Sequence, residues 1–252
     1  MFDVVKVKND CVQWIKEWFE ANGSGCKAVI GISGGKDSSV VSALCVEALG
    51  KDRVVGVLMP NGIQRDIDDA LDLVDHLEIN RVVVNIENAV KGVISGIHSG
   101  WKNPENMMFN ISEQTMINLP PRIRMATLYA ISQSVNGRVV GTDNASEAYI
   151  GYSTRWGDNV ADLMPILSFT SDEVVVIGDA CGLPYELTHK VPSDGLCGKT
   201  DEDNFGFTYE VLNKYIRTGI CEDEVAKAKI DHLHQKNLFK LNPIPTFKPD
   251  CK

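Results

Sequence analysis

Residues 28–49, AVIGISGGKDSSVVSALCVEAL, decide how this chain folds. An apolar run at 28–32 has the length of a buried strand, and it leads through SGGKDSS (33–39) directly into an amphipathic helical pattern. Adjacent glycines allow positive-φ backbone geometry, in which successive N–H groups converge on an anion. The helix start adds unpaired donors and a partial positive charge. The segment therefore predicts a strand, an anion-binding loop and a helix, with the loop at the strand's carboxyl end, where ligands bind in open α/β sheets.

The side chains of this loop favour a phosphate ligand over a plain turn. Ser33, Ser38 and Ser39 offer hydroxyl donors, and Asp37 places a carboxylate where a phosphate-bound Mg²⁺ needs one. A turn without a ligand needs only one capping residue of this kind. The cluster therefore predicts a nucleotide site.

Two other nucleotide-binding loops are excluded. No Gly-x-Gly-x-x-Gly follows a predicted strand, so the Rossmann fingerprint is absent. Gly198-Lys199-Thr200 imitates the end of a Walker A loop, but the required leading glycine falls on Ser193, and no strand precedes it.

Strands and helices alternate along the chain. Short Val/Ile-rich runs predict strands buried on both faces of a parallel sheet, at 27–32, 53–59, 81–86 and 137–142. Helical patterns lie at 3–21, 37–50 (from Asp37), 66–79 (from Asp66), 111–135 (from the ISEQ stretch), 171–180, 201–217 and 221–236. We expect an α/β fold: a doubly wound, Rossmann-like parallel sheet with a helical C-terminal part, in one domain over 1–252.

Composition and charge limit the partners. A net charge of −9 with no Lys/Arg-rich stripe argues against nucleic acid. No apolar run approaches the roughly 18 residues of a membrane span, so no membrane partner is expected. The N-terminus does not resemble a signal peptide. Seven cysteines without a CxxC pair favour reduced thiols, and five histidines show no metal-ligand spacing. We expect a cytoplasmic protein.

The loop SGGKDSS resembles the PP-loop of the ATP pyrophosphatase superfamily, whose members cleave ATP to AMP and pyrophosphate. That superfamily includes tRNA-modifying enzymes, several synthetases and the NAD synthetases, and the loop alone does not choose among them.

Residues 118–209 resemble the NAD synthetase family. Its signature blocks are matched, in order and spacing, by NLPPRIRMATLY (118–129), GTDNASEAYIGYSTRWGDNVADLMPI (141–166), VPSDGL (191–196) and TDEDNFGFTY (200–209). The resemblance implies an adenine nucleotide alpha hydrolase-like fold and a ligase that forms a C–N bond. Such an enzyme converts ATP, deamido-NAD and ammonia to AMP, diphosphate and NAD, through an adenylated nicotinate carboxylate. It also implies a homodimer with deamido-NAD at the interface.

The resemblance also implies the site residues. ATP contacts fall on Gly31, Ile32, Ser33, Gly34, Gly35, Lys36, Asp37, Ser38, Thr142 and Ser193. Asp37 and Glu147 match the positions that hold Mg²⁺, and Thr142 ends a strand expected beside that of the PP-loop. Positions that bind deamido-NAD fall on Arg122, Arg155, Asp162 and the pair Phe239-Lys240.

Departures from the family pattern are informative. Pro120-Pro121 replaces a common Gln-Ala, which we expect to affect only how the following helix starts. Ser171 stands where a lysine often approaches the ATP phosphates. We hypothesise that Lys36 partly replaces that lysine and so belongs with Asp37 and Glu147 among the catalytic residues; the alternative is that Lys36 points to solvent.

Two other functions remain open from the sequence. One is another PP-loop adenylating enzyme, for example one acting on tRNA, although the acidic balance disfavours it. The other is a nucleotide-binding module without turnover, against which both metal carboxylates argue. A glutaminase domain is not expected, because the chain has no separate segment of about 200 residues for one.

Overall fold

Four parallel strands form the sheet of the computed structural model within the residues that it describes, 2–64, 67–100, 110–190 and 200–249. They are β1 (Lys27–Gly31), β2 (Val54–Leu58), β3 (Asn80–Val83) and β4 (Gly137–Val140), in the spatial order β3-β2-β1-β4. Because β1 lies between β2 and β4, the chain winds outward in both directions from the strand that carries the PP-loop. This confirms the predicted doubly wound α/β fold.

The helices are α1 (Val4–Asn22), α2 (Lys36–Leu49), α3 (Ile67–His76), α4 (Glu87–Gly100), α5 (Glu113–Ser134), α6 (Ala145–Ile150), α7 (Ser171–Ala180), α8 (Tyr185–Thr188), α9 (Asp201–Phe205), α10 (Tyr209–Thr218) and α11 (Glu224–Leu241). The predicted start of α3 at Asp66 lies outside the described residues. No helix in the described part of the chain is both long and apolar enough to span a bilayer.

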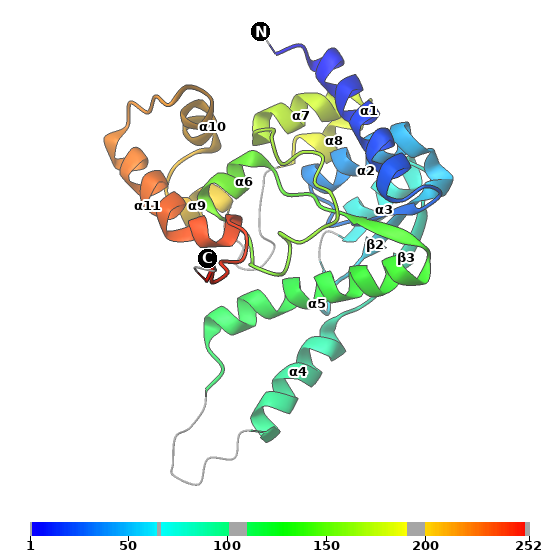
Figure 1. The fold of residues 1–252 in the computed structure, drawn as a ribbon, viewed down its shortest axis with the longest axis horizontal. Helices are drawn as coiled ribbons and strands as arrows, with labels where there is room; N and C mark the ends of the chain where they lie inside the picture. Colours follow the sequence, from blue (N-terminus) through cyan, green and yellow to red (C-terminus); the bar gives the residue numbers. More distant parts are fainter. Residues whose placement is uncertain (1, 65–66, 101–109, 191–199, 250–252) are drawn as a thin grey trace.

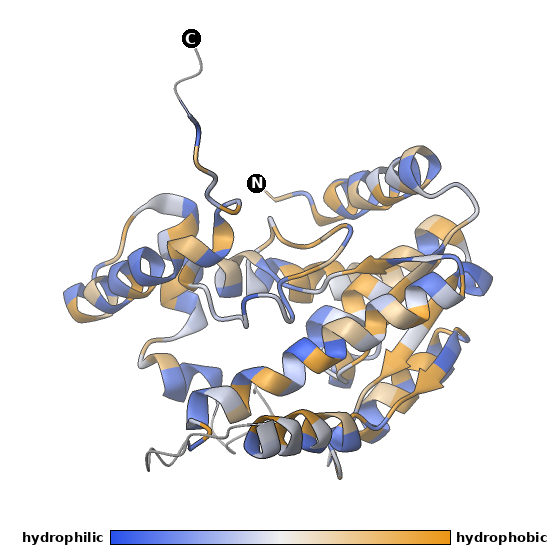
Figure 2. Cartoon of the chain, turned by 60° about the horizontal axis from the view of Figure 1, so that its bottom comes forward, coloured by the Kyte–Doolittle hydropathy of each residue, from blue (hydrophilic) through white to orange (hydrophobic). Residues whose placement is uncertain are grey.

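Both faces of the sheet are covered at β1, β2 and β4, as the continuous apolar strands predict, whereas the edge strand β3 is mostly exposed, so the prediction that it is buried on both faces is wrong. Successive side chains of a strand point to opposite faces. Ala28 and Ile30 of β1 belong to the core shared with α1, α2 and α7, whereas Val29 packs in the core on the opposite face, with α4 and α5. Figure 1 shows the helices on either side of the strands, and Figure 2 shows the strands as a hydrophobic layer between helices of mixed polarity.

The C-terminal part is helical, as predicted, and has a core of its own. Phe205, Tyr209 and Leu212 pack there with Ile150 of α6 and Ile230 of α11. The single helix expected over 201–217 is instead two, α9 and α10. Gly206 ends α9 with a φ of 74°, in the left-handed region that stops a helix.

Other details also differ from the sequence-based expectation. Helices α4, α6 and α8 were not anticipated. The paired prolines do not lie at the start of a helix. Pro120 and Pro121 lie inside α5, which begins at Glu113 and whose N-cap Ser112 accepts the N–H of Thr115. Each proline lacks the backbone N–H that donates a helix hydrogen bond. The prolines therefore weaken α5 locally and do not mark its start.

Candidate active site

The PP-loop presents backbone N–H groups at the carboxyl end of β1. Gly34 has a φ of 83°, a conformation that residues with a side chain rarely adopt, and Gly35 is the N-cap of α2. The N–H groups of Gly34, Lys36 and Asp37 donate to no other group within the described residues. A helix start with unpaired donors is suited to bind an anion.

The serine hydroxyls stabilise the loop itself. Those of Ser38 and Ser39 both donate to the carbonyl of Gly35, at 3.0 and 2.9 Å. The hydroxyl of Ser33 accepts the N–H of Gly35 at 3.2 Å. In this structure the serines therefore fix the loop conformation, and the donors left for a phosphate are backbone groups.

Asn144 joins the two metal-ligand candidates. It lies just beyond β4, the strand next to β1, and its Oδ1 accepts the N–H groups of Ser146 and Glu147 at the start of α6. Its Nδ2 donates to Oδ1 of Asp37 at 3.1 Å. One buried amide thus holds α6, and with it Glu147, against Asp37. The structure brings the two predicted carboxylates together from adjoining strand ends.

The site carries an excess of negative charge. Burial raises the pKa of Glu147 well above its usual range; the charge of Asp37 adds to this, while Lys36 opposes it. Asp143 is only 8% exposed, and no hydrogen bond to its side chain is found among the described residues. Burial, followed by the charges of Asp158 and Asp37, also raises the pKa of Asp143 well above its usual range. Such a group of carboxylates favours a cation.

Lys36 is the cation already present in this group. Its side chain is 6% exposed, and its Nζ lies 2.8 Å from Oδ2 of Asp37. Burial lowers the pKa of Lys36, but the carboxylates of Asp37, Glu147 and Asp201 outweigh it, so that its pKa is raised. The alternative that Lys36 points to solvent is therefore wrong.

A cavity of about 650 Å³ adjoins Lys36. It is lined by Lys36, Ser171, Asp172, Val175, Thr188, His189, Lys190, Glu202, Tyr209, Glu210, Asn213, Lys214 and Arg217. Ser171 brings a neutral hydroxyl to it, which accepts Nδ2 of the buried Asn213 at 3.1 Å. Tyr209 closes one side, with its hydroxyl 3.2 Å from Oδ2 of Asp201.

A second cluster gathers the predicted dinucleotide residues. The guanidinium of Arg155 lies between the rings of Trp156, at 4.9 Å, and Phe239, at 5.1 Å. Its buried Nε has no hydrogen-bond partner among the residues that the structure describes. Arg122 donates to the carbonyl of Arg155 at 3.3 Å, and Lys240 donates to the carbonyls of Gly151 and Ser153. Two aromatic faces around an unsatisfied guanidinium form a place for a flat, anionic group.

Asp158 connects the two clusters electrostatically. Its carboxylate accepts the N–H of Thr154 at 2.6 Å, and it interacts with Asp143 on one side and Lys240 on the other. Neither Asp158 nor Asp143 is among the site residues predicted from the sequence. Both could have been found from the sequence. Asp143 directly follows the strand predicted at 137–142, and Asp158 lies in the 141–166 block, which is the most specific to the family.

The remaining predicted residues fall elsewhere. Asp162 accepts the N–H of Val139 at 2.8 Å and the hydroxyl of Tyr129 at 3.3 Å, so in this structure it supports the edge of β4. Thr142 is half-buried between β4 and Asp143, near the carboxylates, and Ser193 lies outside the described residues.

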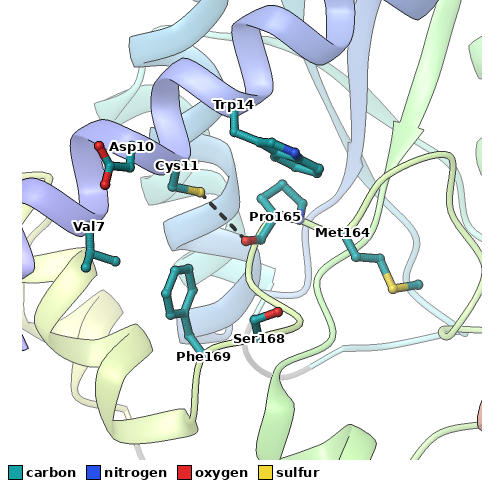
Figure 3. A pocket seen from close by; sticks show the side chains of 8 residues that line it. All are labelled: Val7, Asp10, Cys11, Trp14, Met164, Pro165, Ser168 and Phe169. Carbon is teal, nitrogen blue, oxygen red and sulfur yellow. Dashed lines mark hydrogen bonds between the residues drawn. The ribbon is translucent and has the colours of Figure 1, made fainter.

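A second cavity, of about 390 Å³, contains none of the predicted residues. Figure 3 shows it between α1 and the segment 164–169, where Trp14 and Phe169 face Pro165. The thiol of Cys11 lies 3.7 Å from the Pro165 carbonyl, and burial raises its pKa to about 12. This cavity offers no activated group.

Known proteins share both the sequence and the fold. Residues 7–249 match the family model described as NAD synthase. The NH₃-dependent NAD⁺ synthetase of Alkaliphilus metalliredigens is 37% identical over 93% of this chain and 95% of its own length. That of Thermococcus sibiricus is 39% identical over 85% of this chain and 80% of its own. The solved NMN synthetase of Francisella tularensis superimposes with a TM-score of 0.87 at 29% identity, covering all of both chains.

Proposed function

This chain belongs to the NAD synthase family, and on that premise we propose that it is an ammonia-dependent NAD⁺ synthetase. It is a ligase that forms a C–N bond. The two substrates that it joins are deamido-NAD and ammonia, and ATP is the co-substrate. The observation that carries the proposal is the pairing of Asp37 with Glu147 beside unpaired PP-loop amides. A cytoplasmic location accords with its use of ATP.

The first step activates the nicotinate carboxylate. One carboxylate oxygen attacks the α-phosphorus of ATP, and the bond to the β-phosphate oxygen breaks, so that pyrophosphate leaves and an acyl-adenylate remains. The unpaired N–H groups of Gly34, Lys36 and Asp37 stabilise negative charge on the phosphates, because they are fixed before the reaction begins. Most of the rate gain comes from positioning and charge neutralisation.

The second step forms the amide. Ammonia attacks the acyl carbon, the tetrahedral intermediate collapses, and AMP leaves as the nitrogen loses a proton. A carboxylate is a poor acyl donor, and its adenylate has a leaving group that ammonia can displace. The cluster of Arg155, Trp156 and Phe239 is proposed to bind the dinucleotide substrate, with Arg122 and Lys240 supporting it. For Asp162, a direct contact with the dinucleotide is proposed from the family pattern alone.

The carboxylates fit Mg²⁺. Asp37 and Glu147 offer hard oxygen donors within a group of electrostatically interacting carboxyl groups, and Mg²⁺ is typically held by one or two carboxylates plus substrate phosphates. We propose that Asp37 and Glu147 hold it. When bound, the ion supplies charge neutralisation at the phosphates.

Pyrophosphate release tests this function. We expect release from ATP to depend on deamido-NAD and to be matched by NAD formation when ammonium is present. Transfer RNA in place of deamido-NAD is expected to give no release above that of ATP alone. Release that requires tRNA would point to the other PP-loop enzymes, and absence of any turnover would point to a binding module.

A second substrate is favoured by one observation. The likeness to the Francisella tularensis NMN synthetase covers the whole of both chains, so nicotinate mononucleotide is the alternative carboxylate to be amidated. The same assay decides between the two substrates. Our proposal predicts a higher kcat/KM with deamido-NAD, and a higher value with nicotinate mononucleotide would replace it.

We further propose a homodimer, formed through α4 and the first half of α5. These two helices project from the body of the molecule (Figure 1). Met116 and Ile117 are 47% and 42% exposed there, and Val93 of α4 is 39% exposed. The later apolar residues of α5 pack under the sheet instead. The interface is therefore placed on the projecting part alone, where these apolar side chains are exposed among the described residues.

Light scattering tests the dimer. We expect a mass of twice the 27.7 kDa of one chain. The double variant Met116→Lys/Ile117→Lys should shift the protein toward monomer, because it places two charges in an apolar interface. Val5→Lys, at a residue that is 59% exposed on α1, is the matched control and should leave the mass unchanged. A fully active wild-type monomer would contradict this model.

A further inference from the structure

The cations around the PP-loop cavity are not equivalent. Arg217 contacts Glu173, Lys190 contacts Asp69, and Lys214 lies 2.8 Å from Glu222 with a half-exposed side chain. All three are held by carboxylates that lie outside the candidate site. Lys36 differs because it is buried and its ion-pair partner, Asp37, is itself a proposed metal ligand. Its present position therefore depends on what else binds Asp37.

Lys36 has a route from the carboxylates to the cavity. It lines the cavity, and its Nζ lies 5.9 Å from the centre of the Tyr209 ring that closes one side. A lysine carries its charge on a flexible four-carbon stem with three rotatable donors. The cavity of about 650 Å³ provides space toward which the ammonium can turn. Ser171 lines the same cavity but offers only a hydroxyl already bonded to Asn213.

We propose that Lys36 is an exchangeable cation that holds Asp37 while the site lacks nucleotide and binds the β- and γ-phosphates when ATP arrives with its metal ion. A divalent ion on Asp37 takes over the charge that Lys36 now supplies, and the freed ammonium meets the phosphates in the adjoining cavity. Lys36 is thus a phosphate-positioning residue. This inference rests on the proposed function only for the use of ATP.

Nucleotide binding by calorimetry tests it, without turnover. ATP and AMP are titrated in the presence of Mg²⁺ into wild type and Lys36→Met. ATP affinity is expected to fall roughly 5- to 150-fold, as for loss of a charged hydrogen bond. AMP affinity should change less than about 3-fold, because AMP lacks the phosphates that Lys36 is proposed to hold. A purely structural role would weaken both nucleotides alike and overturns the proposal.

Three further variants keep the result interpretable. Lys36→Arg retains the cation and should keep most of the ATP affinity. Lys36→Met/Ser171→Lys places an ammonium on the opposite wall of the same cavity and should recover part of it. Lys51→Met, at an exposed lysine paired with Glu78, makes the same charge change away from the site and should bind ATP as wild type does.

The failure of this inference is distinct from failure of the proposed function. If Lys36→Met binds ATP as tightly as wild type does, Lys36 holds no phosphate and the inference is wrong, while NAD formation by wild type still stands. If wild type itself does not bind ATP, the proposed function falls as well.

Discussion

Replacing Asp37 or Glu147 by alanine is expected to lower the rate of NAD formation by roughly 100-fold or more. Each change removes one of two carboxylates that lie together beside the PP-loop, and with it a proposed ligand for the metal ion that neutralises the phosphates. Asp37→Ala also removes the partner of Lys36 and of the Asn144 amide. Neither side chain belongs to the apolar core, so both variants should fold.

Steady-state kinetics over a range of Mg²⁺ concentrations measures this effect, with circular dichroism to check folding. Asp75→Ala is the matched control, because it removes an exposed carboxylate that is paired with Arg81 away from the site. It should retain the wild-type rate. If Asp37→Ala or Glu147→Ala does so too, the metal assignment for that residue is wrong.

The second large effect concerns the nitrogen source. Ammonium is expected to support NAD formation by this chain, and glutamine alone is not. Release of ammonia from glutamine requires an activated nucleophile with a nearby base. The thiols of Cys11, Cys45 and Cys181 are poorly suited, because burial raises the pKa of each, to about 12 for Cys11 and about 11 for Cys181. A thiol with such a pKa carries almost no thiolate at neutral pH.

The measurement compares NAD yield with ammonium chloride and with glutamine freed of ammonia by prior treatment. An added glutaminase serves as the positive control, since it should restore activity with glutamine. Equal yields from ammonium and from ammonia-free glutamine would contradict the prediction.

Much of the fold could be predicted from the sequence, because the local hydrophobic patterns of the strands were unambiguous. Each strand was located to within a few residues by a continuous apolar run, and burial of strands on both faces requires a parallel sheet. The meeting of Asp37 and Glu147 also followed, because adjoining parallel strands bring their carboxyl ends to one edge. These features depend on neighbours in the sequence or on a simple rule of topology.

The rest depends on tertiary contacts that no local pattern expresses. Asn144 caps α6, and it also bonds Asp37, a residue 107 positions away in the sequence. The pKa of Lys36 is raised by carboxylates from three separate segments, Asp37, Glu147 and Asp201. Two prolines lie inside α5 although proline has a very low helix propensity. Packing of the helix against the sheet outweighs this cost.

The most direct test of the central claim follows the oxygen atoms of the substrate carboxylate. Deamido-NAD with isotopically labelled carboxylate oxygens is incubated with ATP, ammonium and the enzyme, and the products are analysed by mass spectrometry. If the carboxylate is adenylated, one labelled oxygen per turnover appears in AMP, one remains in the NAD amide, and none enters pyrophosphate. AMP without label, or the label in inorganic phosphate released together with ADP, would contradict an acyl-adenylate and with it the reaction assigned to this site.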